Sequence, residues 1–150
     1  MDLRDLYQDV ILDHSKRPRN FGEAEDANRS ADGNNPLCGD KVTVYLKIAG
    51  EVIEDVRFKA RGCAISIASA SMMTELVKGK RIDEAEAIFE RFHDLLVRKE
   101  PVTPEEMESL DKLAALTGVR AFPTRIKCAT LGWHTFRAAI DDTNEEVTTE

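Results

Sequence analysis

The chain has 150 residues, of which 42% are hydrophobic and 33% charged, a composition typical of one ordinary soluble globular domain. Its formal net charge of -7 argues against binding to nucleic acid, because phosphates are bound by clustered Lys and Arg. No apolar run is long enough to cross a bilayer and the first residues do not form a signal peptide, so we expect a cytoplasmic protein.

The N-terminal part predicts one helix followed by a β-hairpin. Apolar residues at three- and four-residue spacing between Leu3 and His14 predict a short amphipathic helix, with His14 as a packed core histidine. Residues 16–36 lose this periodicity and gain Pro, Gly, Asn and Asp, which indicates an extended loop that could contain a short edge strand. Val42–Ile48 and Val52–Ala60 alternate apolar and polar residues around a turn and predict two paired strands.

The rest of the chain predicts helices. Apolar stripes and end signals place them over residues 64–78, 82–96, about 104–118, and through Leu131 to Ile140. The third of these has the clearest start, because Thr103 is a capping residue, Pro104 occupies the first helical position and Glu106 follows the cap by three residues.

This order of elements predicts an α+β fold, because a tightly joined pair of strands comes first and helices follow. We expect one domain over residues 1–140, with a small antiparallel sheet of about three strands covered by helices on one face. The acidic residues 141–150 are expected to form a disordered tail.

Three cysteines lie at the ends of predicted elements. Cys38 precedes Gly39 and Asp40 ahead of the first strand, Cys63 joins the second strand to a helix, and Cys128 lies near the start of the last helix. An odd number of cysteines favours metal or thiol chemistry over a disulfide framework. Three thiolates and one carboxylate would complete a tetrahedral zinc shell. Because helix starts lower the pKa of a nearby thiol, Cys63 and Cys128 are expected to be thiolates before any metal binds.

Two interpretations of these cysteines remain open at this point. Each cysteine taken alone is explained as a small buried hydrophobic residue, since free cysteines are often buried and inert. Their joint placement at element ends, with Asp40 two residues from Cys38, favours a shared metal site. The spacing lacks the paired C-x-x-C pattern of zinc fingers.

Five short motifs around the cysteines and the first helix form a specific combination. They are Cys-Gly-Asp at 38–40, Arg-Phe-Lys-Ala-Arg-Gly-Cys-Ala-Ile-Ser at 57–66, Val-Lys-Gly-Lys at 77–80, Lys-Cys-Ala-Thr-Leu at 127–131, and His14 with Pro-Arg-Asn-Phe-Gly at 18–22. Together they resemble the IscU/SufU family of iron–sulfur cluster assembly proteins. The resemblance covers about the first 90 residues and residues 123–140, and it implies the same α+β fold.

Two departures distinguish the chain from the IscU branch of that family. The IscU branch carries a His immediately before its last cysteine, where this sequence has Lys127, and it lacks the helical segment expected here at about 98–120. Both departures resemble the SufU branch, the zinc-dependent sulfurtransferases. A Lys side chain at neutral pH has no acceptor atom, so Lys127 does not replace an iron-binding imidazole.

The SufU resemblance implies that Cys38, Asp40, Cys63 and Cys128 bind zinc and that Cys38 accepts sulfur. It also implies a pyridoxal-phosphate (PLP)-dependent cysteine desulfurase of the SufS type as partner, with a partner side chain, a His in the family, replacing Cys38 on zinc before Cys38 attacks the persulfide. A SufBCD-type scaffold would receive the sulfur downstream. Arg125, three residues before Cys128, could stabilise thiolates or orient Asp40, or could be an exposed arginine at a helix start.

Two other functions remain as alternatives to the sulfurtransferase. One is a scaffold that assembles a transient iron–sulfur cluster on the same residues, with iron or a cluster in place of zinc. The other is a binding module in which zinc only stabilises the fold. Lys127 and the segment at about 98–120 favour the sulfurtransferase over the scaffold.

Overall fold

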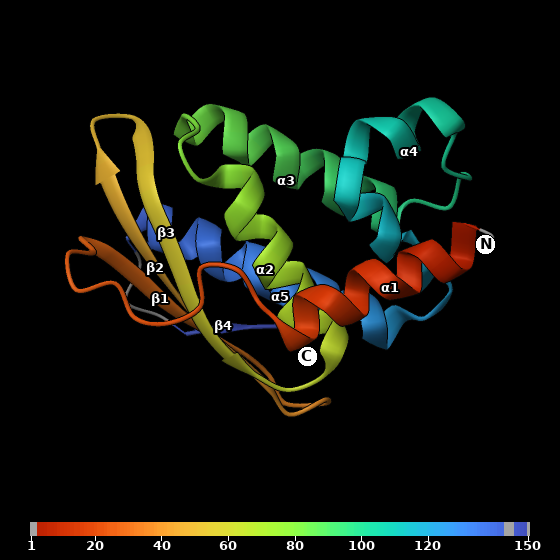
Figure 1. Ribbon diagram of the computed structural model, residues 1–150, viewed down its shortest axis with the longest axis horizontal. Helices are drawn as coiled ribbons and strands as arrows, with labels where there is room; N and C mark the ends of the chain where they lie inside the picture. The colour runs from red at the N-terminus through yellow and green to blue at the C-terminus, as the bar shows by residue number, and fades with distance from the viewer. Residues whose placement is uncertain (1–2, 143–145, 150) are drawn as a thin grey trace.

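The computed structural model of the protein describes residues 3–142 and 146–149. Its α-helices are α1 (Leu3–Lys16), α2 (Ala64–Val77), α3 (Ile82–Val97), α4 (Pro104–Leu110) and α5 (Pro123–Asp141). Its strands are β1 (Arg29–Asn35), β2 (Asp40–Ala49), β3 (Val52–Arg61) and β4 (Val147–Thr148), and a 3-10 helical run, η1, covers Asp111–Ala121. Figure 1 shows the sheet on one side of the molecule and the helices packed against one of its faces, which confirms the predicted α+β class.

The sheet has the strand order β3-β2-β1-β4, in which β1, β2 and β3 are antiparallel and β4 runs parallel to β1. The prediction of about three antiparallel strands was therefore wrong by one strand. Val147–Thr148 falls in the segment predicted to be a disordered tail, of which residues 143–145 and 150 lie outside the described residues. A two-residue strand has no alternation pattern, and its pairing with Gly33 and Asn34 depends on the tertiary fold.

The first strand is longer than its sequence indicates. Arg-Ser-Ala-Asp-Gly-Asn-Asn, at 29–35, is polar and rich in turn residues, yet it pairs with β2 along its whole length. Alternate residues Ala31, Gly33 and Asn35 are buried against the helical layer. Pairing with a strong neighbouring strand overrides the weak β-propensity of the segment.

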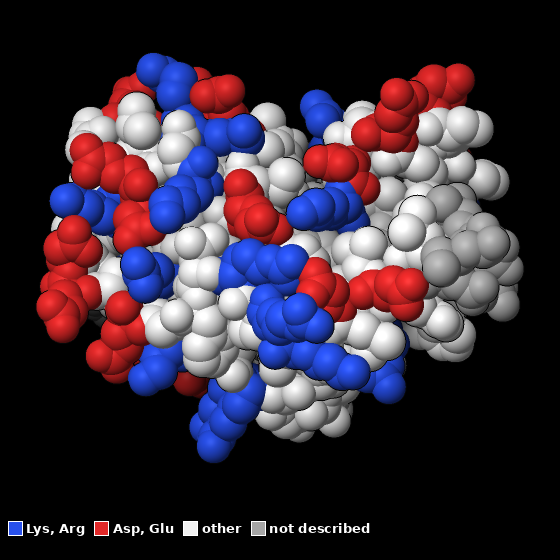
Figure 2. Space-filling model, viewed as in Figure 1, with Lys and Arg blue, Asp and Glu red and all other residues white. Residues whose placement is uncertain are grey.

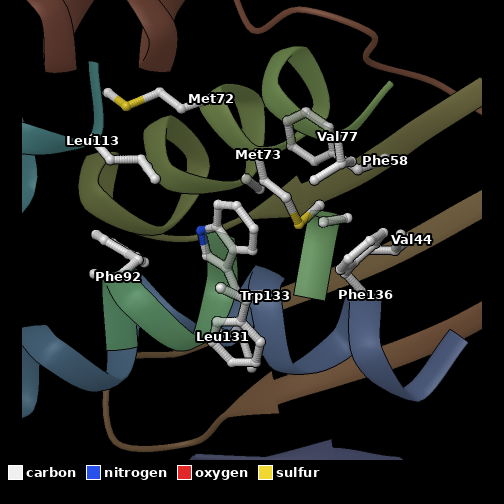
Figure 3. Close-up of a cluster of buried hydrophobic side chains, with 14 of the residues drawn as sticks. Val44, Phe58, Met72, Met73, Val77, Phe92, Leu113, Leu131, Trp133 and Phe136 are labelled. Carbon is white, nitrogen blue, oxygen red and sulfur yellow. The ribbon is translucent and has the colours of Figure 1, made fainter. Parts of the chain in front are cut away.

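The core lies between the sheet and the helices α2 and α5. The inward side chains of β2 and β3 are fully buried or nearly so, and they include Val44 and Phe58. Trp133 of α5 lies at the centre of this cluster in Figure 3, and its ring stacks on that of Phe89 with centroids 5.6 Å apart. This packing fixes α5 over the sheet and so fixes the position of Cys128, one turn before Leu131 on the same helix.

Helix α5 approaches β1 closely at Gly33. A Cβ atom on Gly33 would lie less than 3.0 Å from the Thr135 side-chain oxygen, closer than real Cβ atoms come to other atoms. Because glycine has no Cβ, the helix can pack directly on the strand. Thr135, Leu131 and Cys128 are spaced by four and three residues, so they occupy the same face of α5 and look toward β1.

The predicted third helix is interrupted. It begins as expected, since the Thr103 hydroxyl accepts a hydrogen bond from the Glu106 N–H and the Glu106 carboxylate accepts one from the Thr103 N–H. It was predicted to continue to about Gly118, but α4 ends at Leu110 because Asp111 adopts a positive φ of 53°. The chain continues as η1, whose apolar residues are buried against α1 and α5.

Glu106 also forms a two-armed ion pair with Arg98, which holds the pKa of this carboxyl at about 2, against an ordinary value of 4.5. A lowered pKa in the folded state stabilises the fold above pH 4.5, and that stabilisation is lost as the pH falls through about 2.

Glu106→Gln is therefore expected to lower the urea midpoint of unfolding at pH 7. The difference in midpoint between the variant and wild type should become smaller as the pH falls toward 2. Glu105→Gln, in the same turn, is the control. A difference that stayed constant over this range would contradict the role of the ion pair.

The surface carries both signs of charge. Figure 2 shows acidic and basic side chains mixed over one face, with Lys and Arg gathered below its centre. Among the described residues, no helix combines the length and apolar character that a membrane span requires.

Candidate metal centre

Three separate parts of the chain meet at one end of the sheet, where β1 turns into β2 and β3 leads into α2. Cys38 lies in the turn between β1 and β2, where its N–H donates to the Asn35 carbonyl oxygen at 3.3 Å. Cys63 is the residue that caps the N-terminus of α2, and Cys128 lies in the second turn of α5. Asp40 is the first residue of β2 and pairs with Asn35 across the strands. Residues up to 90 positions apart in sequence thus reach the same place.

The thiols of Cys38 and Cys128 and the carboxylate of Asp40 form a compact group. Their ligand atoms all lie within 4.8 Å of one another, and the two sulfur atoms are 3.3 Å apart. Asp40 and Cys128 are both fully buried, whereas Cys38 is half-buried. A carboxylate removed from water in this way needs a compensating partner such as a cation or hydrogen-bond donors.

Cys63 lies beside Asp40, at the border of this group. Its backbone N–H donates to Asp40 Oδ1 at 2.8 Å, and its sulfur lies 3.8 Å from Asp40 Oδ2. Gly62, with a φ of +137°, makes this approach possible, because a Cβ atom there would lie less than 3.0 Å from both Oδ1 and the Asp40 Cα. The turn from β3 into α2 is therefore built around the carboxylate of Asp40.

The donor set fits a zinc ion. Zinc favours four ligands, takes cysteine sulfur at about 2.3 Å, and in a tetrahedral shell would separate two sulfur atoms by about 3.8 Å. The ligand atoms of Cys38, Asp40 and Cys128 already lie within 4.8 Å of one another, and the sulfur of Cys63, 3.8 Å from Asp40 Oδ2, can supply a fourth donor. Three sulfur donors and one oxygen donor also allow iron, so the residue types by themselves do not exclude a cluster.

The electrostatics of Cys128 differ from the prediction. Burial raises the pKa of the Cys128 thiol above its ordinary value of 9.0, and hydrogen bonds with Asp40 and Cys38 and the nearby Cys63 raise it further. The prediction that a helix start lowers the pKa of this thiol was wrong. Cys128 lies beyond the first turn of α5, and its thiol donates to the Thr124 carbonyl oxygen at 3.5 Å. A bound cation is needed to hold this buried sulfur as a thiolate.

Two other residues singled out in the sequence form no hydrogen bond or salt bridge with the metal-site residues among those described. Arg125 is exposed and lines a cleft of about 920 Å³ between α1, η1 and the start of α5. Within the part of the chain that the structure describes, its guanidinium makes no salt bridge with Asp40, which leaves the exposed-arginine alternative as the simpler one. His14 is 1% exposed and bonds Ser71 Oγ through Nδ1 at 2.8 Å, which confirms it as a packed core histidine.

Asn35 is a site residue that sequence reasoning missed. It is fully buried, and its Nδ2 donates to Cys128 Sγ at 3.5 Å. Among the described residues its Oδ1 has no hydrogen-bond partner, and such a buried unpaired acceptor costs about 1–3 kcal/mol. In the sequence, Asn-Asn-Pro at 34–36 has the composition of a turn, and only the position of α5 reveals what the side chain contacts.

Residues 6–149 match the family described as the NifU-like N terminal domain. The chain is 46% identical over 132 residues to the zinc-dependent sulfurtransferase SufU of Bacillus subtilis, covering 88% of this chain and 87% of that protein. It is 41% identical over 138 residues to the iron–sulfur cluster assembly scaffold protein IscU of Streptococcus pyogenes serotype M1, covering 92% of this chain and 84% of that protein.

A solved structure agrees with these sequence matches. A crystal structure from Fervidobacterium islandicum, described as that of a candidate iron–sulfur cluster assembly scaffold protein for the SUF system, superimposes with a TM-score of 0.78 at 32% identity. The match covers 93% of this chain and 99% of that one. Both the fold and the sequence therefore point to the same group of proteins.

Proposed function

Because the chain belongs to the NifU-like N-terminal (IscU/SufU) family of iron–sulfur cluster assembly proteins, we propose that it is a zinc-dependent sulfurtransferase of the SufU type. One observation carries the proposal: two buried donors, Asp40 and Cys128, face a third donor, Cys38, that lies in a turn. Such a site can keep a metal through its buried side and offer one sulfur to a partner.

Cys38, Asp40, Cys63 and Cys128 would hold the zinc. When bound, zinc supplies a redox-inert positive charge that stabilises sulfur as thiolate and protects it from oxidation. Asp40 is kept in place by the Cys63 N–H, and Cys128 is kept in place by the packing of α5. Asp40 and Cys128 would therefore keep fixed positions on the metal, whereas Cys38 would be the ligand that can leave it.

Cys38 is the best candidate for the sulfur acceptor. The neighbouring Leu37 is 64% exposed, and a Cβ atom on Gly39 would meet nothing within 4 Å, so the turn has room to move. The Cys38 thiolate would attack the outer sulfur of a persulfide on the partner. A new S–S bond forms on Cys38, the S–S bond of the donor breaks, and the donor leaves as a thiolate with no net oxidation.

The partner would be a PLP-dependent cysteine desulfurase of the SufS type, and a SufBCD-type scaffold would accept the sulfur downstream. Exposed apolar residues on the segments that carry Cys38 and Cys128 are suited to docking a protein, since Leu37 and Phe122 are 64% and 59% exposed. Ile65 and Arg125, which line the cleft between α1, η1 and the start of α5, follow Cys63 by two residues and precede Cys128 by three. A desulfurase docked on these segments would bring the outer sulfur of its persulfide next to Cys38.

Sulfide release from cysteine by a SufS-type desulfurase, with a thiol reductant, tests the proposal. Adding the zinc-loaded chain is expected to accelerate release in proportion to its concentration, because Cys38 removes sulfur from the desulfurase. Chelation of zinc should abolish the acceleration, and adding zinc back should restore it. A rate of sulfide release that the chain does not change, or that the metal-free chain raises equally, would contradict the proposal. The remaining interpretation would then be a zinc ion that only stabilises the fold.

A cluster scaffold is the second candidate, favoured by the 41% identity to the Streptococcus pyogenes IscU and by a donor set that accepts iron. It predicts a brown protein with visible absorption bands after anaerobic reconstitution with iron and sulfide. The sulfurtransferase predicts a colourless protein that retains zinc under the same treatment.

A further inference from the structure

We propose that Asn35 is a positioning residue of the metal centre. Its side-chain amide holds the sulfur of Cys128 by an N–H···S hydrogen bond, so that Cys128 stays on the metal while Cys38 is the sulfur that is released. This inference rests on the metal site of the proposed function. It names the residue that gives Cys128 and Cys38 different roles in that site.

The position of Asn35 follows from the packing of β1 against α5. Asn35 is the last residue of β1 and points to the same side of the sheet as Gly33, the side on which α5 packs. Cys128 lies on the facing side of α5, and the Asn35 Nδ2 reaches its sulfur at 3.5 Å. Both side chains are fully buried, so water does not compete for this bond.

The direction of the amide follows from the chemistry of sulfur. A thiolate has lone pairs and no proton, so it accepts hydrogen bonds and only the NH₂ side of the amide can face it. That orientation leaves Oδ1 buried and, among the described residues, without a partner. An apolar side chain of the same size would avoid this cost, so the half-satisfied amide points to a function for its donor side.

The sulfur of Cys38 has a different environment. Within the described part of the chain, its hydrogen-bonding contact is with Cys128 Sγ, at 3.3 Å, and no amide N–H of that part donates to it. A hydrogen bond to a thiolate withdraws electron density from sulfur and lowers its tendency to attack a persulfide. Cys128 is thereby held as a ligand, and Cys38 keeps its full nucleophilicity.

Asn35→Leu tests the role of the amide, because leucine has nearly the same size and no donor. With cobalt in place of zinc, the sulfur-to-metal charge-transfer band is expected to shift to longer wavelength, since a thiolate without its hydrogen bond gives up an electron more easily. Zinc affinity, measured by competition with a chelator, should fall about 10-fold, within the range of about 10–100-fold typical of groups that support metal ligands.

Thr135→Val is the matched control. It removes a buried hydroxyl from the same interface of α5 with β1, whose hydrogen bond goes to the Leu131 carbonyl oxygen and not to a sulfur. This variant should leave the charge-transfer band in place. A shift of the same size in Thr135→Val would show that general loosening of the interface is responsible, and it would overturn the assignment of Asn35.

An unchanged band and unchanged zinc affinity in folded Asn35→Leu would also overturn the proposal. If far-UV circular dichroism shows that Asn35→Leu does not fold, Asn35→Asp decides, because it keeps the shape and replaces the donor with a charge that repels the thiolate. That variant should lower zinc affinity further. These readouts are independent of desulfurase activity, so a wild-type chain that fails to accelerate the desulfurase would contradict the proposed function alone.

Discussion

Cys38→Ala is expected to carry no persulfide after turnover with a desulfurase, while still binding zinc at reduced affinity. Cys128→Ala is expected to lose zinc binding as well as sulfur transfer. The two variants differ because Cys38 lies in a turn at the side of the site, whereas Cys128 is fully buried at its centre and contacts Cys38, Asn35 and the Thr124 carbonyl oxygen. Losing Cys128 also leaves the Asn35 amide without its acceptor, at a cost of about 1–3 kcal/mol.

The measurement is intact-protein mass spectrometry under non-reducing conditions, after the chain has been incubated with a desulfurase and cysteine. Wild type should gain the mass of a sulfur atom and Cys38→Ala should not. Metal analysis of the same samples reports zinc, and thermal unfolding reports the stability that metal binding adds. Added sulfur on Cys38→Ala, or full zinc occupancy in Cys128→Ala, would show that these roles are assigned to the wrong residues.

Gly62→Ala is expected to destroy the metal centre even though it changes no ligand. Residue 62 has a φ of +137°, and an added Cβ would lie less than 3.0 Å from the carboxylate and the Cα of Asp40. The backbone conformation alone costs an L-residue about 1–3 kcal/mol. Because the clash comes in addition, Asp40 must move, and its hydrogen bond from the Cys63 N–H breaks. We expect a loss of stability of about 3 kcal/mol or more, together with loss of zinc.

Gly22→Ala is the control for this variant, since Gly22 has a similar φ of +124° and an added Cβ would meet nothing within 4 Å. It should show the conformational cost without the loss of zinc. Urea unfolding of the metal-free proteins and chelator competition measure the two effects separately. Equal zinc affinities in Gly62→Ala and Gly22→Ala would mean that the contact between Gly62 and Asp40 is not required to form the site.

Much of the fold could be predicted because its signals are local. Alternation of apolar and polar residues predicted β2 and β3, and the pattern from Thr103 to Glu106 predicted the start of α4 with its cap. The break at Asp111 and the short strand β4 were missed, because neither has a signal in its own residues. Both depend on which surfaces the rest of the chain presents to them.

The residues of the candidate site also fall into those that the sequence predicted and those that it did not. Sequence motifs were sufficient to single out Cys38, Asp40 and Cys128, which the structure brings together, and Cys63, which it places beside Asp40. They did not reveal Asn35, whose partner is 93 residues away.

The amino-acid sequence by itself determined the chemistry of this protein: three thiols and one carboxylate, each at the end of an element, in a combination of motifs specific to one family. Only the tertiary structure decided how those groups differ. Burial raises the pKa of Cys128, the turn leaves Cys38 half-exposed, and Arg125 lines a cleft of which Asp40 is not a lining residue. The physical reason is that residue type sets what a group can do, whereas burial and neighbouring dipoles depend on packing between distant segments.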